Sequence, residues 1–327
     1  SLHAPLTDAT RDIINARAIK KMKKGVRIIN CARGGIINEA DLKEALDSGK
    51  VAGAALDVFE VEPAKENALF GHDNVICTPH LGASTTEAQV NVAIQVAEQM
   101  SDYLNNGAVT NALNMPSISA EDAPRLKPYL KLAEDLGKFA GQITNSTIKK
   151  IEIEYEGTIT DVKTDPITST IIANLLGTQL ESVNMVNALQ IAESKGIEIK
   201  QSYDNQSKNW RSMINVIVTT DERVRNVTGT LFTGKEPRIV NIEGVPVEAA
   251  LAKNMLFIRN NDKPGLIGGV GTILGNAGQN IADFRLGRNE NSEEAVCLIA
   301  LDAPINDEIF AELEGLEQIN NLKRLSF

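Results

Sequence analysis

Three residues near the start of the chain have the chemistry needed to take a proton from a hydroxyl group. Arg33, Glu62 and His80 each follow a short apolar run bounded by turn residues, a pattern typical of buried strands. Arginine is a permanent cation whose planar fork of donors suits a carboxylate or a ketone oxygen. Histidine can accept and donate a proton near neutral pH, and a bonded carboxylate would stabilise its charged form and fix its ring. Together the three could deprotonate a hydroxy acid while a second group accepts the hydride.

Helices and strands alternate around these residues, which predicts a parallel α/β sheet. The expected elements are a helix opened by Asp8 and ended by Gly25, a strand at 26–30, a helix from Asn38 to Gly49, and strands at 51–56 and 74–78. Parallel strands end at one edge of a sheet, and open α/β sheets place their sites there. A helix at 85–105 should follow, with its buried side formed by Val90, Val92, Ala93, Val96, Ala97 and Met100.

Composition narrows the class of protein. The chain has 327 residues and a formal net charge of -10, which argues against nucleic acid or an anionic membrane as a partner. Cys31, Cys77 and Cys297 lack CxxC spacing, so we expect buried free thiols in a cytoplasmic protein. With three histidines and no Cys/His cluster, we expect no metal site.

The rest of the chain divides by composition and periodicity into further domains. We expect the end of a catalytic domain at 1–107, a proline-rich linker and return segment at 108–128, an α+β domain at 129–252, and a last domain at 253–327. The middle domain should hold helices at 130–143, 167–180 and 183–195, a strand at 148–155, and further strands up to Glu248. The order of the last domain is βαββαβ, which fits a split βαβ sandwich.

A glycine-rich segment in the last domain imitates a dinucleotide-binding turn. Gly269, Gly271 and Gly275 follow a strand, with Glu290 about twenty residues further on. However, Pro264 and Gly265 should start a helix before these glycines, so we place them inside the helix and reject a phosphate site.

The ordered motifs of the first domain resemble the D-isomer-specific 2-hydroxyacid dehydrogenases, whose fold is a doubly wound, Rossmann-like sheet. The matching segments are His3-Ala4-Pro5-Leu6-Thr7, Asn30-Cys31-Ala32-Arg33-Gly34-Gly35, Leu56-Asp57-Val58-Phe59-Glu60-Val61-Glu62-Pro63 and Thr78-Pro79-His80-Leu81-Gly82. The middle looks like the intervening, allosteric substrate-binding-like domain of the long phosphoglycerate dehydrogenases, and the end is similar to an ACT regulatory domain. The resemblance implies NAD-dependent oxidation of 3-phosphoglycerate to 3-phosphohydroxypyruvate, which opens L-serine biosynthesis.

The resemblance also implies roles for individual residues. Arg33 would hold the substrate carboxylate and the oxygen being oxidised, His80 would be the acid/base, and Glu62 its partner. Asp57 would meet the nicotinamide amide, although a strand-end cap is the alternative for this residue. The other residues implied beside the NAD cofactor are Ala4, Cys31, Ala32, Arg33, His80, Leu81, Gly82 and Ala83.

The ACT-like end implies feedback by L-serine. The matching effector positions are Asn260, Asp262 and Asn280, with Asp262 facing the effector amine and Asn280 bonding across a domain pair. Such paired sites imply a homo-oligomer, in this case a tetramer.

Several alternatives stay open at this point. The substrate of the dehydrogenase could be another 2-hydroxy acid such as 2-hydroxyglutarate, or the chain could be a non-catalytic amino-acid-sensing module. Because the family's glycine-rich NAD turn would lie upstream of Ser1, we expect the chain to be the C-terminal part of a longer enzyme and to be inactive alone. Glu60, two residues before Glu62, is interpreted as a solvated side chain.

Overall fold

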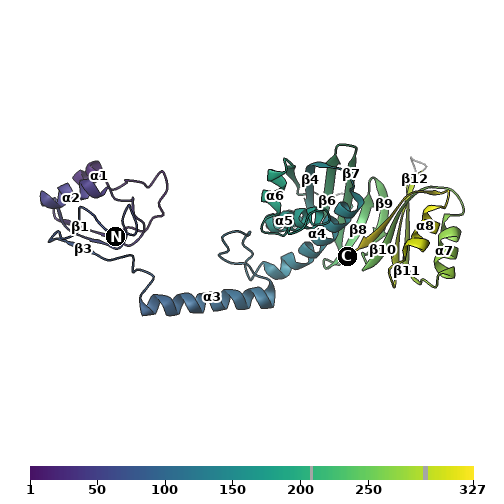
Figure 1. Ribbon diagram of the computed structural model, residues 1–327, viewed down its shortest axis with the longest axis horizontal. Helices are drawn as coiled ribbons and strands as arrows, with labels where there is room; N and C mark the ends of the chain where they lie inside the picture. Colours follow the sequence, from purple (N-terminus) through teal and green to yellow (C-terminus); the bar gives the residue numbers. More distant parts are fainter. Residues whose placement is uncertain (207–208, 290–293) are drawn as a thin grey trace. The chain divides into compact units, whose positions relative to one another are not determined.

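A computed structural model describes residues 1–206, 209–289 and 294–327 (Figure 1). The chain folds into two compact units, Ser1–Glu98 and Gln99–Phe327. Glu290, named above beside the glycine-rich segment, lies outside the described residues.

The first unit is built on a parallel sheet of strand order β1-β2-β3. These strands are β1 (Val26–Asn30), β2 (Val51–Leu56) and β3 (Val75–Cys77), so all three predicted strands are confirmed. Helices α1 (Ala16–Lys21) and α2 (Glu39–Asp47) belong to the same unit, and their apolar side chains join those of the strands in one core. Leu2 adds a parallel bridge to Asn30, which extends the sheet beside β1.

The first predicted helix begins later than expected. Asp8 does not cap it: residues 8–12 form turns, and Asn15 caps α1 by accepting a hydrogen bond from the Ala18 amide. Ile14, which fitted the helical spacing, instead bridges Ile37 in parallel. The Asn15 cap and the Ile14 bridge therefore start the helix after Ile14, although the apolar spacing suggested an earlier start.

Helix α3 (Thr86–Asn106) has the predicted length but not the predicted buried side. None of its residues is buried, and Val90, Val92, Val96 and Met100 are between 48% and 59% exposed. Apolar spacing shows which face of a helix can be buried; it does not supply the surface that buries it.

The first helix that lies entirely in the second unit is α4 (Ala123–Ile143). It starts before the predicted 130–143 because Pro124 occupies its first turn, where no amide donor is needed. A six-stranded sheet of order β5-β4-β6-β7-β8-β9 lies beside it. Its strands are β4 (Ile148–Gly157), β5 (Glu198–Asp204), β6 (Ser212–Thr220), β7 (Val224–Phe232), β8 (Glu236–Ile242) and β9 (Val245–Ala249). The helical segments η1 (Thr158–Asp161), α5 (Asp165–Leu176) and α6 (Ala188–Ser194) complete this part.

The chain ends in the predicted βαββαβ order. Its elements are β10 (Asn254–Asn261), α7 (Leu266–Asn276), β11 (Ile281–Arg288), β12 (Glu294–Leu301), α8 (Asp307–Glu314) and β13 (Ile319–Ser326). The antiparallel sheet has the order β11-β12-β10-β13. Gly269, Gly271 and Gly275 lie inside α7, so their predicted place within a helix is confirmed.

Both faces of this last sheet are covered, since successive side chains point to opposite sides. Phe257 packs edge-on against Phe139 of α4, with ring centroids 5.7 Å apart, whereas Leu256 joins the core formed with α7 and α8. A buried ion network spans the same junction: Glu243 pairs with Arg225 at 2.6 Å and with Arg259 at 2.7 Å. The two sheets of the second unit are therefore joined by apolar packing and by charge.

The cysteines differ from the expectation of buried thiols. Only Cys297 is buried, while Cys77 is half-buried and Cys31 is exposed, because Cys31 follows the end of β1 and lies in the site loop. None of the helices in the described ranges is long and apolar enough to cross a membrane.

Candidate active site

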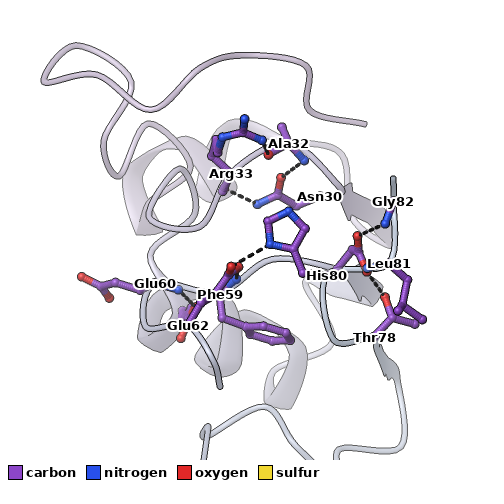
Figure 2. Close-up of polar contacts among 12 residues, drawn as sticks. Asn30, Ala32, Arg33, Phe59, Glu60, Glu62, Thr78, His80, Leu81 and Gly82 are labelled. Carbon is purple, nitrogen blue, oxygen red and sulfur yellow. Dashed lines mark hydrogen bonds and ion pairs between the residues drawn. The ribbon is translucent and has the colours of Figure 1, made fainter. Parts of the chain in front are cut away.

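Three loops meet at the carboxyl edge of the first sheet. The loop after β1 carries Arg33, the loop after β2 carries Glu62, and the loop after β3 carries His80 (Figure 2). Asp57 directly follows β2. Parallel pairing sets this arrangement, because Asn30 is in register with Leu56 and Leu56 with Cys77.

The buried side chain of Asn30 shapes the first loop. Its Oδ1 accepts from the Ala32 amide and its Nδ2 donates to the Arg33 carbonyl, both at 3.0 Å. Asn30 is only 2% exposed, so these bonds replace the water that its amide would otherwise need. The Asn30 side chain thus fixes the backbone of the loop that carries Arg33.

Gly34 allows the first two loops to touch. A Cβ atom at Gly34 would lie 1.7 Å from the carbonyl oxygen of Phe59, so no larger residue fits without moving the backbone. The contact brings the Arg33 loop against the segment that carries Glu62. Close packing against Phe59 therefore explains why a glycine follows Arg33.

The predicted contact between Glu62 and His80 is present. His80 Nδ1 and Glu62 Oε2 are 2.7 Å apart, and the two side chains are 50% and 32% exposed (Figure 2). The other carboxylate oxygen of Glu62 accepts from the Phe59 amide at 2.9 Å. The Phe59 amide first, and then His80, hold the pKa of Glu62 below its usual value. Glu60 makes no such contact, and its backbone amide donates to Glu39.

His80 has a left-handed backbone with φ of 60°, which is uncommon for a residue with a side chain. Such a conformation costs roughly 1–3 kcal/mol and persists when surrounding contacts determine it. Here those contacts come from Asp57, which is 4% exposed and accepts bonds from Thr78, Leu81 and Gly82. Burial alone would raise the pKa of Asp57, but these hydrogen bonds outweigh it and hold the pKa below the usual value.

Arg33 lies on the neighbouring loop without bonding to Glu62 or His80. Its Nη1 donates to the carbonyl of Ala32 at 2.7 Å, and the residue is exposed. The structure therefore brings two of the three predicted catalytic side chains into contact. The third has a guanidinium with donors left for an anion.

The residues expected beside the cofactor fall into two groups. Ala4, Cys31, Ala32 and Arg33 line an open hollow of about 470 Å³. Leu81, Gly82 and Ala83 follow His80 on the third loop and are exposed. Small side chains prevail in both groups, so their backbones are accessible to a flat ring system, which fits a nicotinamide dinucleotide.

The expected effector residues are only partly brought together. Asn260 and Asp262 line a hollow of about 290 Å³, together with the start of α7 and Arg288. Arg288 binds Asp262 Oδ2 through Nε at 2.6 Å and through Nη2 at 2.5 Å. Asn280 does not line this hollow, and its side chain donates to Asp302.

Some of these contacts could not be read from the sequence. The roles of Asn30, of the Phe59 amide and of Arg288 depend on distances between segments. The position of Asn30, at the last residue of a strand and just before the predicted site loop, was the one available signal for it.

Comparison with known proteins finds two similar domain families. Residues 1–82 match the family model of the D-isomer specific 2-hydroxyacid dehydrogenase NAD binding domain, and residues 125–243 match the D-3-phosphoglycerate dehydrogenase intervening domain. The first 82 residues are therefore similar to the NAD binding domain of the D-isomer specific 2-hydroxyacid dehydrogenases.

Named members of the family are similar over nearly the whole chain. A D-3-phosphoglycerate dehydrogenase of Bacillus subtilis (strain 168) is 40% identical over 324 residues, which are 99% of this chain and 62% of that protein. A Methanocaldococcus jannaschii protein of the same name is also 40% identical, over 99% of this chain and 61% of its own. The chain thus spans about three fifths of the length of these relatives.

Solved structures include a similar glyoxylate reductase from Paecilomyes thermophila. It is 39% identical over 33% of each chain, with a TM-score of 0.31.

The contact of His80 Nδ1 with Glu62 leaves Nε2 of the same ring available to a hydroxyl group. If Nδ1 carries the proton of that bond, Nε2 is the basic nitrogen and can accept the hydroxyl proton. The resulting imidazolium is stabilised by the Glu62 carboxylate. The arrangement is therefore suited to reversible proton transfer.

We expect the Glu62 carboxyl to titrate below its usual value of 4.5 when followed by carbon-detected NMR. Because the Phe59 amide is the larger cause, His80→Gln should raise the midpoint without restoring 4.5. Because the pKa of Glu62 is lower in the folded than in the unfolded chain, its hydrogen bonds stabilise the fold at neutral pH. This stabilisation is lost as the pH falls through the folded-state pKa.

His72→Gln is the matched control, since His72 bonds Asp47 and the Asn74 amide and touches neither Glu62 nor His80. A Glu62 midpoint at or above 4.5 in the unchanged chain would contradict the two hydrogen bonds.

Proposed function

We propose that the protein is an NAD-dependent oxidoreductase that converts 3-phosphoglycerate to 3-phosphohydroxypyruvate. The observation that carries this proposal is the 2.7 Å contact between His80 and Glu62 beside the loop of Arg33. The substrate class is supported by the names of the relatives that are 40% identical over 99% of the chain.

The proposed reaction removes the proton of a hydroxyl group and a hydride from the carbon that bears this group. The bound nicotinamide would supply the hydride acceptor. His80 Nε2 takes the hydroxyl proton, and the carbon–oxygen bond becomes a ketone. Arg33 turns from the Ala32 carbonyl to hold the substrate carboxylate and the oxygen being oxidised, where its planar donors suit both groups.

We expect His80→Gln to lower kcat by about 10²–10⁴-fold in the full-length gene product, the range for loss of a general acid/base. Glu62→Gln should cause a smaller loss in the same direction, because the ring keeps a hydrogen-bonding partner but loses the negative charge. The measurement is the rate at which NADH forms, followed by the absorbance of the reduced cofactor.

Two matched variants control for general damage. His72→Gln and Glu60→Gln change the same residue types outside the contact and should leave kcat unchanged. Wild-type kcat in His80→Gln would exclude the proposed acid/base. A panel that includes 2-hydroxyglutarate separates the two substrate classes.

We further propose that Asn260 and Asp262 form part of an L-serine effector site. Asn260 is 2% exposed, and its Oδ1 has no hydrogen-bond partner, so a ligand donor would satisfy a buried acceptor. Asp262 would take the ligand amine in place of Arg288, which then becomes available for the carboxylate. Asn280 would come from a second copy in a homo-oligomer, a tetramer in our proposal.

Calorimetry of L-serine with the chain tests this site. Asp262→Asn should weaken binding by at least about tenfold, because one charge-assisted hydrogen bond is worth roughly 1.5–3 kcal/mol. Asp307→Asn is the control, since Asp307 pairs with Arg324 and lies outside the hollow. Unchanged affinity in Asp262→Asn would overturn the assignment. Serine binding by a full-length product without dehydrogenase activity would instead favour a sensing module.

A further inference from the structure

Asp57 is a buried carboxylate whose partners are all hydrogen-bond donors from one short segment. Its Oδ1 accepts from Thr78 Oγ1 at 2.5 Å and from the Leu81 amide at 2.7 Å, and its Oδ2 accepts from the Gly82 amide at 2.8 Å. No ion pair with Asp57 occurs in the part of the chain that the structure describes. The charge of Asp57 is therefore balanced by the segment that carries His80.

The donors lie on both sides of His80. Thr78 precedes it by two residues, and Leu81 and Gly82 follow it directly. The left-handed backbone of His80, with φ of 60°, lets the chain reverse between these donors. Two successive amides then point at one carboxylate, an arrangement that binds anions well.

Close packing supports the same arrangement. A Cβ atom at Gly82 would lie 3.2 Å from Asp57 Oδ2, so the glycine allows its amide to approach the carboxylate. The Thr78–Gly82 loop therefore contacts the Asp57 carboxylate both before and after His80. The direction of the His80 side chain, toward Glu62, follows from this fit (Figure 2).

We propose that Asp57 is a positioning residue that acts through the Thr78–Gly82 loop to hold the His80 imidazole against Glu62. This role rests on the proposed function of His80 as the acid/base. It differs from the nicotinamide contact implied by the family resemblance, because the partners of Asp57 are the loop's own donors. A direct cofactor contact would not involve the Thr78 hydroxyl.

Three variants separate the two roles. Asp57→Asn replaces one acceptor oxygen by a donor, which cannot accept from the loop amides. Thr78→Val removes one donor at nearly constant volume and touches no proposed cofactor contact. Asp73→Asn, in an exposed turn between β2 and β3, is the matched control.

The first readout is hydrogen exchange of the Leu81 and Gly82 amides in the 327-residue chain, which needs no activity. We expect exchange at least about tenfold faster in Asp57→Asn, since bonds to a charged acceptor are the strong ones. Thr78→Val should give a smaller increase, and Asp73→Asn none. Wild-type exchange in Thr78→Val and Asp57→Asn would overturn the proposal. Because Thr78→Val loses a single bond, it decides the matter if Asp57→Asn does not fold.

The second readout is kinetic, in the full-length gene product. We expect Asp57→Asn and Thr78→Val to lower kcat with little change in the KM for NAD, and Thr78→Ser to restore kcat. A raised KM for NAD with unchanged kcat and unchanged exchange would assign Asp57 to the cofactor instead. If His80→Gln keeps full activity, the proposed function fails, whereas the exchange result still tests the loop contacts by themselves.

Discussion

The parallel register of β1, β2 and β3 is the constraint on which the site depends. It brings the ends of three strands to one edge, so loops that are far apart in the sequence touch through side chains and backbone amides. Gly34 permits one of these contacts, where the first loop meets the carbonyl of Phe59. A change in register would separate Glu62 from His80 without altering either residue.

Two carboxylates in this site are held in different ways. The Glu62 carboxylate contacts the His80 ring and a backbone amide. Its negative charge can therefore stabilise the imidazolium that forms when His80 takes a proton. Asp57 is buried among neutral donors, and their hydrogen bonds, with a smaller contribution from His80, outweigh burial and hold its pKa below the usual value. One acid therefore takes part in the proposed proton transfer, and the other holds the loop on which that transfer depends.

The sequence predicted much of the first unit because its strands are short apolar runs between strong turn signals. β1 and β2 have their predicted bounds, and Asn38 caps α2 as its position indicated. The prediction of Asp8 as a helix cap was wrong, because residues 8–12 form turns and Asn15 caps α1. Both residue types can cap a helix, so the local sequence does not show which of the two does. The apolar side of α3 failed for another reason, since burial needs a second surface.

For the site, residue types and order predicted the Glu62–His80 contact but not the supporting bonds. Asn30, Thr78 and Arg288 act through distances to other segments, and no spacing in the sequence encodes those distances. The roles of the site residues, the domain boundaries at 107, 128 and 252, and the oligomeric state stay predictions.

A crystal structure of the full-length gene product with NAD and a 2-hydroxy acid tests the central claim most directly. The account predicts His80 Nδ1 within hydrogen-bonding distance of Glu62, Nε2 at the substrate hydroxyl, and the Arg33 guanidinium moved from the Ala32 carbonyl onto the substrate. A substrate bound away from this edge of the sheet, or a His80 ring turned away from Glu62, would contradict it.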